Sequence, residues 1–144
     1  MFEVDERLAQ DTIFLGDFAL CRVLLMNDSR YPWLILVPRC AAISEVFELT
    51  VEQQQQFWQE TNYVGCVLKK VFQADKVNIA TLGNVVEQLH MHVVLRMRND
   101  EVWPAPVWGK GDAQHYTAAD VAKISETLHS ALAEHWLSTA EVHV

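Results

Sequence analysis

The chain has 144 residues, within the range of about 100–200 residues that one domain typically spans, so we expect a single domain. Hydrophobic residues make up 51% and charged residues 21% of the sequence, a balance that fits a globular protein and excludes a disordered chain. The net charge of −8 excludes most nucleic-acid and anionic-membrane binding, because both partners repel an acidic protein.

The three cysteines also limit the class of protein. Their number is odd, and they lack the spacing of a disulfide framework or of a cysteine zinc cluster. The first ten residues are acidic, with no apolar segment typical of a secretory signal. The longest strongly apolar run, 33–37, is far shorter than the roughly 20 residues of a membrane helix. We therefore expect a cytoplasmic protein without a membrane partner.

The first elements in chain order are strands. Residues 12–26 read as two strands separated by a turn near Gly16 and Asp17. Residues 33–38 form a short apolar strand that ends at Pro38, because proline cannot donate a hydrogen bond to a sheet.

A long helix and two more strands follow. Thr50 and Gln53 form a capping box, and apolar residues then recur at helical spacing over 51–73. Residues 76–83 and 88–98 read as strands.

The last part of the chain is a loop followed by a second helix. The loop, 99–116, contains Trp103 and Trp108, which either pack as ordinary loop residues or form a wall beside a site. The helix, 117–138, has a buried stripe of Val121, Ile124, Leu128, Leu132 and Trp136. This order predicts an α+β fold: a mostly antiparallel sheet of about five strands, with two main helices on one face and the other face free to carry a site.

The strand at 88–98 carries the clearest chemical signal. Side chains alternate between the two faces of a strand. One set is apolar and fits the face under the helices: Leu89, Met91, Val93, Leu95 and Met97. The other set is nearly all polar and should face solvent or a cleft: Gln88, His90, His92, Val94, Arg96 and Arg98.

His90 and His92 lie two positions apart, so their side chains project from the same face at a spacing of about 7 Å. The pair has three readings. The histidines are exposed by chance, or they are half of a zinc site, although zinc usually takes three or four ligands. In the third reading, a neutral imidazole attacks phosphorus as a nucleophile while its other ring nitrogen holds a proton.

The residues around this pair resemble a known family. The segment 83–96, GNVVEQLHMHVVLR, resembles the signature of the histidine triad (HIT) superfamily, and LILVPR at 34–39 is similar to that family's upstream strand. The resemblance covers residues 10–98. The sequence VWPAPVWGKG at 102–111 resembles a bacterial branch related to diadenosine polyphosphate hydrolases.

The resemblance implies a role for each matching residue. His90 matches the middle histidine, the nucleophile on the α-phosphate, and His92 matches the last histidine, which contacts phosphate and assists the leaving group. Asn84 and Arg96 are expected to bind phosphate oxygens, and Asn27 lies where the family holds the nucleoside.

The sequence departs from the family pattern at three positions. Gln88 replaces the first histidine; it keeps a hydrogen-bonding side chain at the phosphate site but cannot carry a proton charge. Val85 replaces a hydroxyl residue that contacts phosphate in many members, and Trp33 replaces a histidine found in much of the family.

The resemblance thus implies a nucleotide hydrolase or nucleotidyl transferase that cleaves at the α-phosphate of a nucleotide polyphosphate or phosphoramidate, through a nucleotidyl intermediate on His90. It implies no metal, no cofactor and a homodimer. Two alternatives stay open: a nucleotide-binding module with little catalysis, which Gln88 and Val85 favour, and a metal-binding protein that uses His90 and His92.

Overall fold

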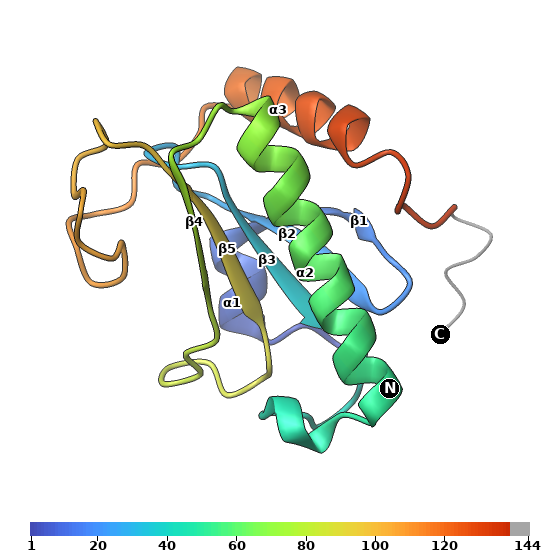
Figure 1. The fold of residues 1–144 in the computed structure, drawn as a ribbon. Coiled ribbons are helices and arrows are strands. Elements are labelled where there is room, and N and C mark those ends of the chain that lie inside the picture. The colour runs from blue at the N-terminus through green and yellow to red at the C-terminus, as the bar shows by residue number, and fades with distance from the viewer. Residues whose placement is uncertain (139–144) are drawn as a thin grey trace.

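The computed structural model describes residues 1–138 and shows one five-stranded sheet with helices (Figure 1). The strands are β1 (Thr12–Asp17), β2 (Cys21–Met26), β3 (Trp33–Pro38), β4 (Lys76–Ala80) and β5 (Met91–Arg96), and the helices are α1 (Glu6–Asp11), α2 (Val51–Val71) and α3 (Ala118–Ala131), with a short 3-10 turn at Val46–Glu48. The strand order is β1-β2-β3-β5-β4, and each neighbouring pair is antiparallel. This confirms the α+β class and the five strands.

One face of the sheet packs against α2 and α3 (Figure 1). Thr50 and Gln53 form the expected capping box at the start of α2. Phe57 and Leu68 of α2 are fully buried with Leu128 of α3 and with apolar side chains of the strands, including Leu34, Leu36, Met91, Val93 and Leu95. The prediction of two main helices on one face is therefore confirmed.

The opposite face is not free, which corrects our expectation. Phe2 and Leu8, from the N-terminal segment and α1, form a second apolar cluster there with Val107 from the 99–116 loop. The strand side chains beneath them are Trp33, Ile35, Val37 and Val94. Helix α1 was not predicted, because a six-residue segment with few apolar side chains is too short to show a helical repeat of apolar residues. Leu8 becomes buried only by packing against the sheet.

Strand β5 begins at Met91, so Gln88 and His90 precede it. The apolar residues at the odd positions of 88–98 face the helices, as predicted. The prediction that the other set faces solvent or a cleft is wrong for Val94 and Arg96, which are 0% and 1% exposed. They are buried because the 99–116 loop and the N-terminal segment cover that face.

The last helix ends earlier than predicted, at Ala131. Trp136 therefore does not belong to a helical stripe, but it still packs on the sheet beside Gly16. A Cβ atom at Gly16 would lie 2.8 Å from the indole ring, so only glycine permits this close approach. Among residues 1–138, no helix is long and apolar enough to cross a membrane.

Two buried ion pairs hold the 99–116 loop against the sheet. Arg96 Nε lies 2.8 Å from a carboxylate oxygen of Asp100, which also accepts hydrogen bonds from backbone N–H groups at the start of the loop. Arg30 Nη2 lies 2.8 Å from Asp28, and Arg30 Nη1 donates to the carbonyl of Lys110. The loop is thus attached at both ends by charged groups that solvent barely reaches.

We expect Asp100→Ala to lower the free energy of unfolding by about 3–5 kcal/mol, because it leaves the buried guanidinium of Arg96 without its partner. Urea unfolding measures this loss. Asp112→Ala, which removes an exposed carboxylate from the same loop, is the matched control and should change stability by less than about 0.5 kcal/mol. Equal losses in the two variants would contradict the structural role of the Arg96–Asp100 pair.

Candidate functional site

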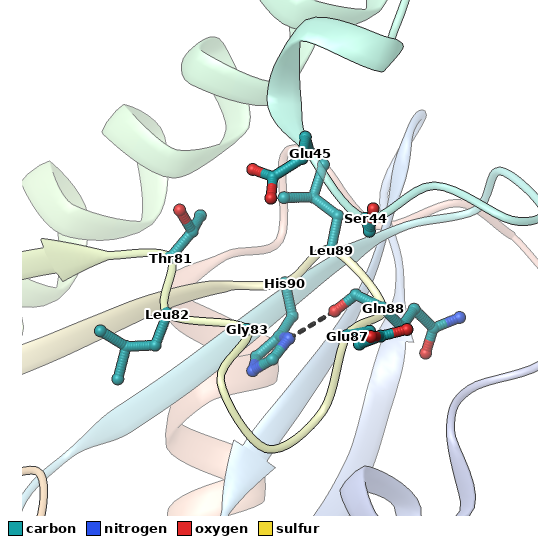
Figure 2. A pocket seen from close by; sticks show the side chains of 9 residues that line it. All are labelled: Ser44, Glu45, Thr81, Leu82, Gly83, Glu87, Gln88, Leu89 and His90. Carbon is teal, nitrogen blue, oxygen red and sulfur yellow. Dashed lines mark hydrogen bonds between the residues drawn. The ribbon is translucent and has the colours of Figure 1, made fainter.

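His90 lies in the turn that leads into β5, and its ring is fixed by the backbone. Its Nδ1 atom is 2.7 Å from the carbonyl oxygen of Gln88 (Figure 2). A carbonyl oxygen only accepts hydrogen bonds, so Nδ1 carries the proton. The lone pair of the neutral imidazole is therefore on Nε2, as a nucleophile at this position requires.

The His90 side chain lines a cavity of about 200 Å³. The cavity is formed by Ser44, Glu45, Thr81, Leu82, Gly83, Glu87, Gln88, Leu89 and His90 (Figure 2). A water molecule occupies about 30 Å³ of the liquid, so there is room for a phosphoryl group. Two of the lining residues are glutamates and none is a lysine or arginine. An anion in this cavity must therefore be stabilised by hydrogen-bond donors rather than by side-chain cations.

His92 lies on β5 beside His90, with 4.9 Å between the two ring centroids. Its Nδ1 accepts a hydrogen bond of 3.0 Å from the indole Nε1–H of Trp33 on β3. Because the indole only donates, the neutral His92 ring carries its proton on Nε2. The two imidazoles thus hold opposite tautomers: His90 presents a lone pair on Nε2, and His92 presents an N–H donor there.

His92 is kept neutral by its surroundings. Burial, and to a smaller extent the neighbouring His90, together lower its pKa from the ordinary value to about 3. Trp108 completes the enclosure, with its ring centroid 5.4 Å from that of His92 and 6.1 Å from that of Trp33. Trp108 of the 99–116 loop thus packs directly beside His92.

Gln88 does not extend the row of side chains as we expected. Its side chain points away from the His90 ring (Figure 2). The amide donates to the carbonyl of Glu3 and accepts from the backbone N–H of Asp5, both at 2.7 Å. The backbone carbonyl of Gln88 orients the His90 ring, while its side chain ties the N-terminal segment to the turn before β5. The side chain falls out of the row because β5 begins only at Met91, so strand alternation does not apply at 88.

The structure does not bring Arg96 or Asn84 into the His90 cavity. The Arg96 guanidinium is buried, donates to both carboxylate oxygens of Asp100 and to Asn78 Oδ1, and cannot meet a phosphate that arrives from solvent. Asn84 is exposed on the loop between β4 and β5 and is not one of the residues that line the cavity. Arg96 is thus unavailable to a ligand because Asp100, in the turn after β5, already pairs with it.

Asn27 lines a second cavity, of about 310 Å³. Its side-chain oxygen accepts a hydrogen bond from the backbone N–H of Tyr116, which joins the end of β2 to the end of the long loop. Trp33 and Trp108 line this cavity and their rings also pack against His92, which itself lines neither of the two cavities. From the sequence, Trp33 was recognised only as a departure from a family pattern. Its hydrogen bond to His92 could not be predicted, because the two residues are far apart in sequence.

A metal site finds little support in this arrangement. Within the part of the chain that the structure describes, no group of three or more histidine, cysteine, aspartate or glutamate side chains is placed to hold a metal ion. One nitrogen of His92 already accepts from the Trp33 indole, and one nitrogen of His90 donates to a carbonyl.

Comparison with known proteins gives a consistent result. The family model described as the HIT domain matches residues 7–99. A histidine triad protein from Marinobacter aquaeolei VT8 is 45% identical, with 94% of this chain and 98% of that chain covered and a TM-score of 0.92. A histidine triad protein from Sinorhizobium meliloti 1021 is 47% identical, with coverage of 94% and 97% and a TM-score of 0.85. A third, from Bradyrhizobium japonicum, is 40% identical, with coverage of 94% and 98% and a TM-score of 0.86. No match was found among curated proteins.

The lowered pKa of His92 predicts how stability depends on pH. Between the ordinary value near 6.5 and the folded value of about 3, the unfolded chain binds a proton that the folded chain does not, so stability falls as pH decreases through this range. Between pH 7 and 5, the wild type should lose about 2 kcal/mol more than His92→Gln, which has no proton to bind at this position. Urea unfolding of both proteins at the two pH values measures the difference, and equal losses would show that His92 titrates normally.

Proposed function

Because this chain belongs to the histidine triad family, whose members are generally nucleotide-binding proteins, hydrolases or transferases, we propose that it is a nucleotide hydrolase or nucleotidyl transferase with His90 as its nucleophile. The observation that carries the proposal is the His90 ring itself. Its Nδ1–H is held by the Gln88 carbonyl, which leaves the Nε2 lone pair free at a cavity of phosphoryl size. The proposed substrate is a nucleotide whose α-phosphate bears a leaving group.

The first proposed step forms a covalent intermediate. Nε2 of His90 attacks the α-phosphorus, an N–P bond forms, and the bond from phosphorus to the leaving group breaks with its electron pair on the leaving group. The Nδ1–H bond to Gln88 then stabilises the positive charge that develops on the imidazole. The intermediate is a nucleotidyl-histidine.

The second proposed step regenerates the enzyme. Water attacks the same phosphorus and loses a proton to solvent, the N–P bond breaks with its electron pair returning to Nε2 of His90, and the mononucleotide leaves with the oxygen of that water. Throughout, the Nε2–H of His92 donates to phosphate oxygens. Preorganised donors of this kind typically lower a barrier by about 2.7–4 kcal/mol each.

The second cavity suits the nucleoside. It is lined by the indole rings of Trp33 and Trp108, which pack against His92 and offer apolar surface for a base. It also includes Asn27, the residue that we proposed for this role. The attachment of the long loop through Arg30 keeps this wall in place before substrate binds.

Trapping the intermediate tests the proposal. The substrate, diadenosine tetraphosphate or adenosine 5′-phosphoramidate, is labelled at the α-phosphorus and mixed with an excess of enzyme. The wild type should retain acid-labile label, and His90→Ala should retain none. His135→Gln is the matched control, because His135 stacks on Tyr63 of α2, on the helix-covered side of the sheet, and it should keep full labelling. Tight binding of nucleotide by the wild type with no label would instead identify a binding module with little catalysis.

The acidic cavity predicts weak affinity for highly charged leaving groups. Glu87 is exposed at the cavity, and Glu87→Gln should lower the KM for diadenosine tetraphosphate about threefold at low salt, as expected for exposed charges that interact with about 1 kcal/mol or less. The effect should disappear near 1 M salt, where the screening length is about 3 Å. Glu52→Gln, an exposed glutamate at the start of α2, is the control. A KM that Glu87→Gln leaves unchanged at low salt would show that the polyphosphate lies elsewhere.

A further inference from the structure

The hydrogen bond from Trp33 to His92 restricts what His92 can do. The indole nitrogen of Trp33 can donate a hydrogen bond but cannot accept one, and it donates to Nδ1 of His92 at 3.0 Å. Protonation of Nδ1 would break this bond and place two N–H groups against each other. We propose that Trp33 is a positioning residue that holds His92 as a neutral Nε2–H donor, so that His92 stabilises phosphate oxygens but does not supply a proton to the leaving group.

The packing around Trp33 supports this role. Trp33 is 6% exposed on β3, opposite Val94 of β5, and its ring meets Tyr31 and Trp108 edge-on at 6.4 and 6.1 Å. The indole is thus enclosed by large side chains, and its N–H has little freedom to turn away from His92.

Among residues 1–138, no other group is placed to give His92 a second proton. Its partners on the neighbouring strands are Ile35 on β3 and Ala80 on β4, and Trp108 covers it from the long loop. The titratable group that faces it is His90, whose own Nδ1–H is engaged by a carbonyl. A carboxylate, which would favour the imidazolium, does not contact His92 in the described part of the chain. The lowered pKa agrees with this geometry.

This restriction determines the class of leaving group, and the argument rests on the proposed function. If neutral His92 gave up its Nε2 proton, a strongly basic imidazolate would remain, so the ring serves as a hydrogen-bond donor and not as an acid. The leaving group must then depart as a stable anion and take its proton from water. A phosphate released from a phosphoric anhydride meets this requirement, whereas the amine of a phosphoramidate must be protonated to leave. We therefore assign nucleoside phosphoanhydrides, rather than phosphoramidates, as the substrate class.

Leaving-group dependence tests the assignment. The probes are aryl esters of adenosine 5′-monophosphate whose phenols differ in acidity, with p-nitrophenyl and phenyl esters as the extremes. In single turnovers at pH 6, the ratio of p-nitrophenyl to phenyl rates should be about 10²-fold larger for the wild type than for Trp33→His, the lower end of what a general acid contributes. Histidine at 33 can accept from a protonated His92 and so permits acid catalysis. Equal ratios in the two proteins would overturn the inference.

A spectroscopic measurement tests the same point without activity. In the 15N NMR spectrum of the wild type, His92 should show an unprotonated Nδ1 and a protonated Nε2 at every pH from 8 to 5. Trp33→Phe, which keeps the bulk and removes the N–H, should release this tautomer and raise the pKa of His92. A wild-type His92 that is protonated at Nδ1 or titrates near its ordinary pKa would refute the positioning role, whatever the variants do.

The two proposals fail in different ways. If no substrate labels His90 in the wild type, the proposed function is wrong. If the label forms but phosphoramidates react as readily as anhydrides of the same nucleotide, the function stands and the role of Trp33 is wrong.

Discussion

The site depends on one hydrogen bond, between Nδ1 of His90 and the carbonyl of Gln88. It decides which nitrogen of His90 can act as a nucleophile, and it requires a fixed backbone at 88–90. That backbone is held from two sides. The N–H of Leu89 donates to the carbonyl of Ile43, and the Gln88 amide is bound to backbone groups of the N-terminal segment. The residue that replaces the first histidine of the family pattern therefore has a structural task of its own.

The second imidazole is controlled by a different kind of group. His90 is oriented by an acceptor from its own segment, whereas His92 is oriented by a donor, Trp33, from the neighbouring strand. Two chemically identical rings thus present a lone pair and an N–H, respectively, on their Nε2 atoms. This division suits a reaction in which one ring bonds to phosphorus and the other stabilises oxygen.

Charge explains why the site relies on hydrogen bonds. The chain has a net charge of −8, and the cavity beside His90 includes Glu45 and Glu87 but no lysine or arginine. Two arginines are used instead to build the fold: Arg96 pairs with Asp100 and Arg30 with Asp28, and both pairs attach the long loop. The cavity beside His90 thus offers an anion neutral hydrogen-bond donors, whereas the second cavity is lined by the indole rings of Trp33 and Trp108 and also by Arg30 and Lys110.

The sequence alone determined what repeats along the chain. Alternation predicted that His90 and His92 lie side by side, and their ring centroids are 4.9 Å apart although His90 precedes β5. Helical spacing with a capping box located α2. Both patterns involve neighbours in sequence. Tertiary structure decided which polar groups remain available. Arg96 is buried because Asp100 and the long loop cover it, Gln88 turns away because β5 begins after it, and Trp33 controls His92 because two strands 59 residues apart pair side by side. Trp33 and His92 are remote in sequence, and only the folded sheet brings them within hydrogen-bonding distance.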